Sequence, residues 1–133
     1  MPYLLDTHML IWFQEDNPKT PEGVMQLLQN RENSIFFSQV SLFEIAIKQT
    51  IGKLPLFTAT IMDVYEQALK DDFIFLPIHN THLAAYNNVP LLAEHRDPFD
   101  RLLIAMAHVE GLTMITADKN FGLYPDLVKV VWS

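Results

Sequence analysis

The 133-residue chain contains no cysteine, only four glycines and only nine Lys and Arg residues. Without cysteine, disulfide bonds and thiolate metal sites are excluded, so the fold has to be stabilised by its hydrophobic core. No apolar run is long enough to span a bilayer, and no basic segment precedes an apolar stretch of signal-peptide length. We therefore expect a soluble protein of the reducing cytoplasm, with no membrane partner.

The shortage of positive charge bears on the choice of substrate. Sixteen Asp and Glu residues give a formal net charge of −7, which argues against a nucleic-acid binder. The objection weakens if several acids are clustered around a divalent cation, because the cation then neutralises them. Net charge alone therefore does not exclude a phosphodiester substrate.

Half of the residues are hydrophobic, and there is no low-complexity segment, repeat or flexible linker, so we expect one folded domain over residues 1–133. Short apolar segments alternate with helical patterns. This alternation predicts an α/β fold, with a mainly parallel β-sheet of about five strands sandwiched by α-helices. The predicted strands lie near residues 3–5, 35–37, 73–76, 112–116 and 128–131.

Apolar periodicity and start and stop signals predict the helices between these strands. Residues 61–69 show the clearest amphipathic repeat, and residues 99–108 are almost all apolar, which predicts a buried helix ended by Gly111. Thr20 is predicted to cap another helix. Ser41 and Glu44 fit the capping box of a further one.

The first strand runs directly into an aspartate. Leu4 and Leu5 precede Asp6, and the apolar segment 9–13 follows it. Ligands of open α/β sheets bind beyond the carboxyl ends of the strands. A buried carboxylate at such a place needs a counter-charge, a hydrogen bond or a metal ion. Asp6 is therefore the leading candidate for a functional carboxylate.

Three further acids occupy equivalent places in the predicted fold. Glu44 lies in the helix after the second strand, Asp100 opens the buried helix, and Asp118 follows the fourth strand. Strand ends and the helix starts that follow them share one edge of a parallel sheet, so all four carboxylates are expected in one crevice. Their oxygens favour Mg²⁺ or Mn²⁺ over Zn²⁺. One or two such ions can activate a water for in-line displacement at phosphorus.

Each of these acids also has a purely structural explanation. Glu44 fits the capping box or an i,i+4 pair with Lys48. Asp97 is placed to cap the buried helix, in whose first turn the helix dipole favours an acid such as Asp100. Asp118 can cap a helical turn. A capping account, however, gives no reason for four acids to lie at one edge of the sheet.

Other side chains give fewer indications of a site. The five histidines form no H-x-x-x-H pair, and we predict that they lie at the surface rather than bind a metal. No G-x-S-x-G motif and no glycine-rich phosphate loop is present. Thr7 and Thr116 can hydrogen-bond a metal-bound water or a phosphate, or can cap a helix.

Four segments, in order, resemble the motifs of the PIN-domain family, and in particular the VapC-type toxin ribonucleases of type II toxin–antitoxin systems. The segments are Leu4-Leu5-Asp6-Thr7-His8 and residues 41–48, 95–105 and 115–118. The resemblance spans the chain. It implies a Mg²⁺- or Mn²⁺-dependent endoribonuclease, often a homodimer, that a cognate antitoxin protein inhibits by laying a segment across the acidic cleft.

The resemblance assigns residue roles position by position. Asp6, Glu44, Asp100 and Asp118 match the catalytic, metal-binding acids, with ligation falling mainly to Asp6 and Asp100. Asp97 is the second aspartate of the third motif and is interpreted as a cap or outer partner. Supporting or RNA-binding roles are expected for Thr7, Lys48, Asp97 and Thr116. Under the nuclease hypothesis, the candidate cations for the RNA backbone are Lys48, Arg96, Arg101 and Lys119. The open alternative is that they pair with neighbouring acids, above all Arg101 with Asp97 four residues earlier.

Two other functions remain open from the sequence. A different metal-dependent phosphohydrolase, such as a haloacid-dehalogenase-like phosphatase, would carry a second aspartate two residues after Asp6, where this chain has His8. A non-catalytic module would use the acids only to bind a basic partner. For such a module, an Asp6→Asn change would abolish no activity.

Overall fold

The computed structural model of the protein describes residues 1–132. Within this range, five strands form one sheet in the order β3-β2-β1-β4-β5, and every neighbouring pair is parallel. The strands are β1 (Pro2–Leu5), β2 (Ser34–Ser38), β3 (Ile74–Leu76), β4 (Thr113–Thr116) and β5 (Val130–Trp132). The predicted α/β fold with a parallel five-stranded sheet is confirmed.

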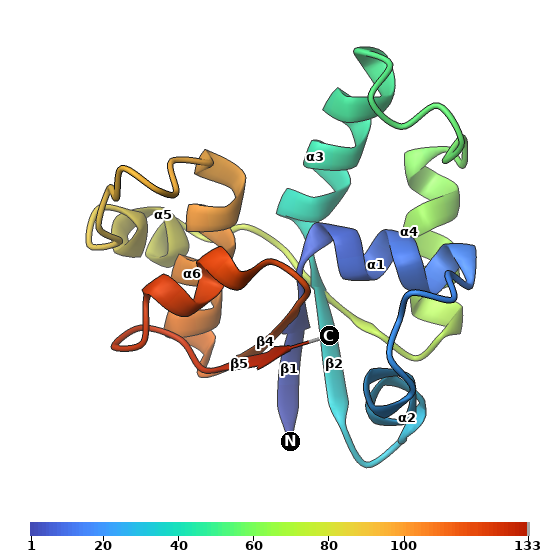
Figure 1. The fold of residues 1–133 in the computed structure, drawn as a ribbon, viewed down its shortest axis with the longest axis horizontal. Helices are drawn as coiled ribbons and strands as arrows, with labels where there is room; N and C mark the ends of the chain where they lie inside the picture. Colours follow the sequence, from blue (N-terminus) through green and yellow to red (C-terminus); the bar gives the residue numbers. More distant parts are fainter. Residues whose placement is uncertain (133) are drawn as a thin grey trace.

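Helices cover both faces of this sheet (Figure 1). In the part of the chain that the structure describes, they are α1 (Thr7–Glu15), α2 (Glu22–Gln29), α3 (Gln39–Thr50), α4 (Ile61–Lys70), α5 (Asn80–Tyr86), α6 (Pro98–Glu110) and the 3-10 helix η1 (Lys119–Leu123). One face carries α1, α2 and α4, the other carries α5 and α6, and α3 rises from the carboxyl edge of the strands. Among residues 1–132, no helix is long and apolar enough to cross a membrane.

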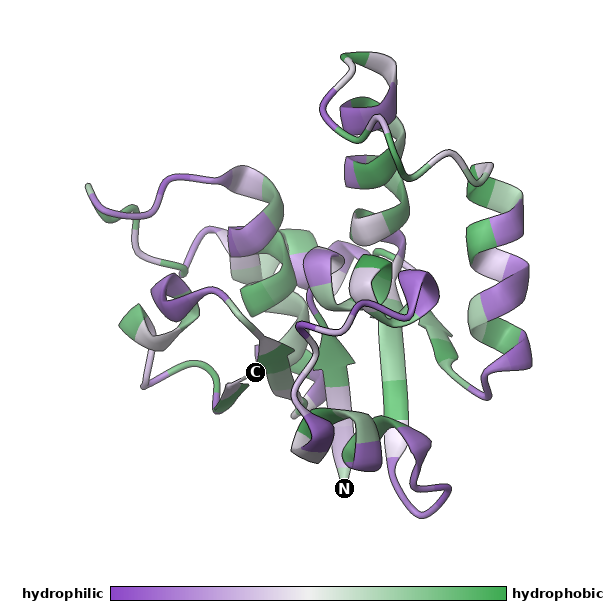
Figure 2. Ribbon diagram, turned by 45° about the vertical axis from the view of Figure 1, so that its right-hand side comes forward, coloured by the Kyte–Doolittle hydropathy of each residue, from purple (hydrophilic) through white to green (hydrophobic). Residues whose placement is uncertain are grey.

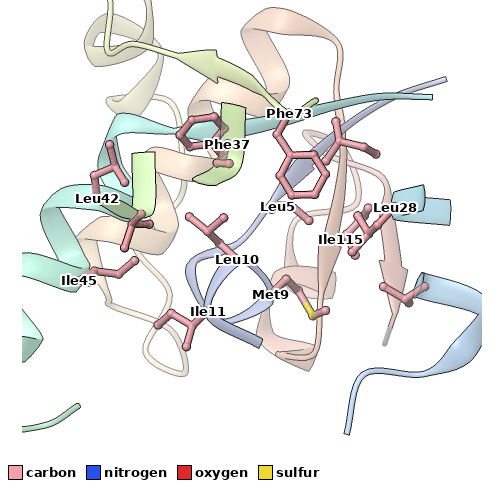
Figure 3. Packing of buried hydrophobic residues seen from close by; sticks show 14 of the residues in the cluster. Leu5, Met9, Leu10, Ile11, Leu28, Phe37, Leu42, Ile45, Phe73 and Ile115 are labelled. Carbon is pink, nitrogen blue, oxygen red and sulfur yellow. The ribbon is translucent and has the colours of Figure 1, made fainter. Parts of the chain in front are cut away.

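Two hydrophobic clusters fill the space between the sheet and its two helical layers. Successive side chains of a strand point to opposite faces, so Leu5 and Ile115 join the cluster under α1 and α2, whereas Leu4 and Met114 join the cluster under α6. Figure 3 shows the first cluster, in which Leu5 and Ile115 pack with Met9 of α1. Each fully buried side chain of this size contributes about 1.5–3 kcal/mol, so both faces anchor the strand ends firmly.

Hydropathy follows this layered arrangement. In Figure 2 the central strands are mostly green, that is hydrophobic, whereas the outer helix α4 alternates between green and purple. Strands covered on both faces lack the polar alternation of a half-exposed sheet. In α4, Val64 and Ala68 are buried while Asp63 and Glu66 are exposed, which confirms the predicted amphipathic helix.

Two predicted helix starts are wrong. Pro21, not Thr20, is the cap residue of α2, and it provides no side-chain hydrogen bond. Helix α3 begins at Gln39, because the Ser38 hydroxyl accepts a hydrogen bond from the Val40 N–H at 2.9 Å. The predicted capping box of Ser41 therefore does not form, and its serine lies fully buried in the first turn of α3.

Candidate metal centre

Asp6 lies at the carboxyl end of β1, between the two hydrophobic clusters. Its backbone N–H donates to the Ile115 carbonyl at 3.1 Å, which continues the β1–β4 ladder and fixes its position. The side chain is only 3% exposed. It caps α1 by accepting from the Met9 N–H at 2.8 Å, and it accepts a second hydrogen bond from the Thr116 hydroxyl.

Burial is the main influence on the ionisation of Asp6. Removal of the carboxyl group from water raises its pKa to about 6, although the bonds from Thr116 and Met9 favour the charged form. The negative charges of Asp118 and Glu44 raise the pKa further. Both acids therefore lie close enough to Asp6 for their charges to act on it.

Glu44 reaches the same edge of the sheet from the second turn of α3. Its side chain is 4% exposed, and its Oε2 pairs with Lys48 Nζ at 2.7 Å. On the other side, the Thr7 hydroxyl lies 2.7 Å from Oε1 and 3.0 Å from the Ser41 hydroxyl. The carboxylate is thus held in one orientation by contacts from α1 and α3.

Asp100 lies in the first turn of α6. Its Oδ2 is 2.8 Å from Nε2 of His95, a histidine that is only 4% exposed. Burial raises the pKa of Asp100 to about 6, the His95 contact lowers it, and the charges of Asp97 and Glu44 raise it. Glu44 therefore acts electrostatically on both Asp6 and Asp100.

Asp118 arrives from the loop after β4. Its N–H donates to the Thr116 hydroxyl at 2.9 Å, and its side chain caps η1 by accepting from the Asn120 N–H at 2.9 Å. One ligand atom from each of His95, Asp100 and Asp118 lies within 4.8 Å of the other two. This spacing is short enough for one cation to contact all three.

The structure thus brings the four predicted carboxyl groups together at the carboxyl edge of β1, β2 and β4. Asp118 adjoins Asp100 and acts on Asp6, while the charge of Glu44 acts on both Asp6 and Asp100. The residues come from four separate parts of the sequence. Their catalytic and metal-binding roles stay predictions.

The predicted supporting residues lie next to these acids. Thr7 and Lys48 contact Glu44, and Thr116 contacts Asp6. Asp97 caps α6, since its Oδ1 accepts from the N–H groups of Phe99 at 2.8 Å and Asp100 at 3.2 Å. The contacts of Asp97 are therefore those of a helix cap, as the capping explanation predicted.

Arg101 does not lie at the rim of the site. It is 91% buried, donates to the Tyr86 hydroxyl at 2.7 Å and the Val89 carbonyl at 2.8 Å, and stacks over the Tyr86 ring. The guanidinium thus holds α6 against the last residue of α5 and the turn that follows it. Its predicted role as an RNA-binding cation is wrong, because α6 turns it into the interior.

Two of the five histidines are buried, contrary to the predicted surface positions. His82 pairs with Glu110 at 2.8 Å and accepts from the His79 N–H at 2.9 Å, which ties α5 to α6. His95 belongs to the acidic site, and sequence analysis missed it. The sequence feature that could have identified it is its position five residues before Asp100. A search for two histidines at helical spacing does not detect this feature.

The donor set at this edge fits a hard divalent cation. Four carboxyl groups gather there, and two of them have pKa values raised to about 6 because they are buried beside other negative charges. Among residues 1–132, the Lys48 ammonium is the only Lys or Arg group that forms an ion pair with one of the four carboxylates. The contact of His95 with Asp100 is an ion pair only when the histidine is protonated. A divalent cation would relieve the remaining repulsion, and carboxylate oxygens are the ligands that Mg²⁺ and Mn²⁺ prefer.

Comparison with known structures supports the same fold. VapBC2 from Rickettsia felis, bound to a DNA fragment from its promoter, matches at a TM-score of 0.71 and 18% identity, covering 98% of each chain. VapBC-1 from nontypeable Haemophilus influenzae matches at a TM-score of 0.66 and 20% identity, covering 99% of this chain and 98% of that one. DNA-bound VapBC from Salmonella typhimurium matches at a TM-score of 0.68 and 14% identity, covering 98% of this chain and 97% of that one.

Sequence comparison identifies the family. No curated protein sequence matches this chain. The family model described as "PIN domain" matches residues 3–127, which include all four clustered acids and His95. The match covers nearly the whole chain, and the fold likeness to the VapBC structures agrees with it. The chain therefore belongs to the PIN domain family.

Proposed function

We propose that this protein is a Mg²⁺- or Mn²⁺-dependent endoribonuclease and the toxin of a toxin–antitoxin pair. The observation that carries the proposal is the meeting of Asp6, Glu44, Asp100 and Asp118 at one edge of the sheet. PIN domain proteins are generally nucleases, and this membership supports phosphodiester hydrolysis. Several chains of similar fold come from VapBC structures, and one comes from a toxin–antitoxin complex of Klebsiella pneumoniae.

In this proposal Asp6 and Asp100 hold the cation, and Glu44 and Asp118 complete its surroundings or hold waters. When bound, the cation supplies Lewis acidity, which makes water a better nucleophile and offsets the charge that develops at the phosphate. The protein's own contribution is to fix these carboxylates before substrate arrives. Thr116 and the start of α1 hold Asp6, and Lys48 holds Glu44.

The RNA backbone needs positive charge that this acidic edge lacks. Exposed Lys119 directly follows Asp118, exposed Arg96 directly follows His95, and partly exposed Lys48 pairs with Glu44. We assign these three side chains to the phosphates on either side of the scissile bond. Because the chain carries a net charge of −7, the divalent cation would also be needed for RNA binding.

A cognate antitoxin, a homodimeric state and a cytoplasmic location belong to the same proposal. The VapBC structures of similar fold support a protein partner. An inhibitory segment with a basic side chain fits the acidic edge, since it would neutralise the carboxylates in place of a metal ion. Such a segment and the RNA would then compete for one site.

RNA cleavage by the purified chain tests the enzymatic part of the proposal. Wild type is expected to cut a mixed RNA substrate with MgCl₂ or MnCl₂ and to stop in excess EDTA. Asp6→Asn and Asp100→Asn are expected to lower cleavage at least about a hundredfold. The matched control is Asp63→Asn, an exposed acid of α4, which should keep wild-type activity.

Three results would contradict the proposal. Cleavage that persists in EDTA would show that the activity does not depend on a metal ion. Full activity of Asp6→Asn would show that the clustered acids are not the active site. No cleavage under any metal condition supports the non-catalytic acidic module instead. Induced expression in cells tests the toxin role, because wild type should arrest growth whereas Asp6→Asn and Asp100→Asn should not.

A further inference from the structure

His95 is a buried imidazole whose ring is held from several sides. Its ring centroid lies 5.8 Å from that of Phe121 and 5.6 Å from that of Tyr124. Only 4% of the residue is exposed, and its Nε2 faces Asp100 at 2.8 Å. A ring nitrogen of His95 therefore has a fixed position beside the carboxylates of Asp100 and Asp118.

The hydroxyl of Tyr124 contacts the ring nitrogen of His95 that faces away from Asp100. This hydroxyl donates to the backbone carbonyl of His95 at 3.4 Å, so its oxygen is free to accept from Nδ1 of the same residue at 3.0 Å. A neutral imidazole has one N–H and one lone pair. Without a metal ion, an N–H on Nε2 can donate to the Asp100 carboxylate; with the N–H on Nδ1 and the Tyr124 oxygen as its acceptor, the lone pair of Nε2 faces Asp100 and is available to a cation.

A lone pair that faces two carboxylates is repelled unless a positive species lies between them. A proton can satisfy Nε2 and Asp100, and a metal ion can satisfy Nε2, Asp100 and Asp118 together, since their ligand atoms lie within 4.8 Å of one another. Metal-bound histidines usually direct their other ring N–H to an oxygen acceptor, which fixes the ring and raises its basicity. The Tyr124 hydroxyl is placed to be that acceptor.

We infer that Nε2 of His95 is a nitrogen ligand of the divalent cation, together with Asp100 and Asp118, and that it makes the site prefer Mn²⁺ to Mg²⁺. Transition-metal ions accept imidazole ligands, whereas Mg²⁺ strongly prefers oxygen and keeps several waters. The inference rests on the proposed metal-dependent function and deepens it. In a metal site made only of carboxylates, the buried histidine would have no role as a ligand.

The test uses the full chain with Mn²⁺ alone as the probe. Pulsed electron paramagnetic resonance detects a ¹⁴N nucleus directly bound to Mn²⁺, and calorimetry gives the Kd for Mn²⁺ and for Mg²⁺. Wild type is expected to show the nitrogen coupling. His95→Gln should lose it and bind Mn²⁺ at least about tenfold more weakly, with less than about a threefold change for Mg²⁺.

Two controls separate ligation from a structural role. His108→Gln removes an exposed histidine at the far end of α6 and should keep both the coupling and the Kd. Labelling wild type with ¹⁵N-histidine should replace the ¹⁴N pattern, a result that does not depend on the folding of any variant. Tyr124→Phe keeps the ring in place, so it should retain the coupling while weakening Mn²⁺ binding severalfold.

The outcomes distinguish this inference from the proposed function. If wild type binds Mn²⁺ and cleaves RNA but shows no nitrogen coupling, the ligand role of His95 is overturned and the nuclease stands. If His95→Gln weakens Mn²⁺ and Mg²⁺ binding equally, its role is to position Asp100, and the metal preference is overturned. If wild type binds no divalent cation, the proposed function itself fails.

Discussion

At the scale of single residues, Asp6 and Asp100 are acids whose pKa values of about 6 lie above the 3.8 of an exposed aspartate, because both are buried. The folded chain therefore binds these protons more tightly than the unfolded chain. The contribution of these two groups to the free energy of unfolding is fully present below about pH 4. It is lost as the pH rises from about 4 to about 6, and it does not change further above that pH. Over the whole range, each group costs at most about 3 kcal/mol, less for the partly exposed Asp100.

This linkage predicts how the metal-free protein responds to pH. In EDTA, the free energy of unfolding of wild type should fall between pH 5 and pH 7.5 by about 1 kcal/mol for each of the two acids. Asp6→Asn should lose less stability over this range, since the amide carries no charge. Urea denaturation at both pH values measures the difference between variant and wild type.

At pH 7.5 without metal, the same Asp6→Asn variant should be more stable than wild type, by about 1–2 kcal/mol. Its amide oxygen can still accept from the Met9 N–H, so the cap of α1 is kept. If the variant unfolds at a lower denaturant concentration than wild type under these conditions, the ionised Asp6 does not destabilise the folded protein.

At the scale of elements, the start of α6 places Asp100, and Asp97 caps that start. The cap satisfies the N–H groups of Phe99 and Asp100, which have no partner within the helix. At the other end, Gly111 takes the left-handed conformation that ends α6, with φ of +67°. Both ends were predicted from sequence, because capping residues act locally.

Asp97 provides a test of the difference between a helix cap and a metal ligand. Asp97→Ala should lower the free energy of unfolding by about 1 kcal/mol, and Asp97→Asn should change it much less, because Asn also caps helices well. Mn²⁺ binding should persist in Asp97→Asn. Thermal unfolding and calorimetry measure the two effects.

A different result would reassign the third motif. If Asp97→Asn lost Mn²⁺ binding to the same degree as Asp100→Asn, then Asp97 would be a ligand and the choice between the two aspartates would be wrong. Asp63→Asn, in the first turn of α4, controls for the general effect of removing one acid from a helix start.

Element boundaries and contacts set the limit of sequence prediction here. The strand–helix alternation and the rule that strand ends share an edge were enough to predict that four acids would meet. The start of α3 was missed because the segment offers two serines, Ser38 and Ser41, and only packing decides which one caps. His95 was missed because its position depends on Tyr124, 29 residues away.

At the scale of the whole molecule, the sheet collects charge at one edge while two hydrophobic clusters hold its faces. The chain carries a net charge of −7, and under the proposed function the polyanionic RNA would bind at the acidic edge. Repulsion at that place is removed only when cations are bound. Metal would therefore govern the binding of RNA as well as its cleavage.

RNA binding by the whole molecule should accordingly depend on divalent cations. Fluorescence anisotropy with a labelled RNA is expected to show binding in Ca²⁺, a hard cation used here to support binding while limiting cleavage, and much weaker binding in EDTA. The comparison uses KCl at matched ionic strength, so that general screening is equal. Equal affinity in both conditions would mean that RNA approaches the protein away from the acidic edge.

The central claim is that carboxylates from four separate parts of the chain share a divalent cation. An anomalous difference map from a crystal grown with MnCl₂ tests it most directly. We predict a strong peak within coordination distance of Asp6 and Asp100 in wild type, and none at that place in Asp6→Asn. A wild-type crystal with excess Mn²⁺ and no peak between these carboxylates would contradict the claim.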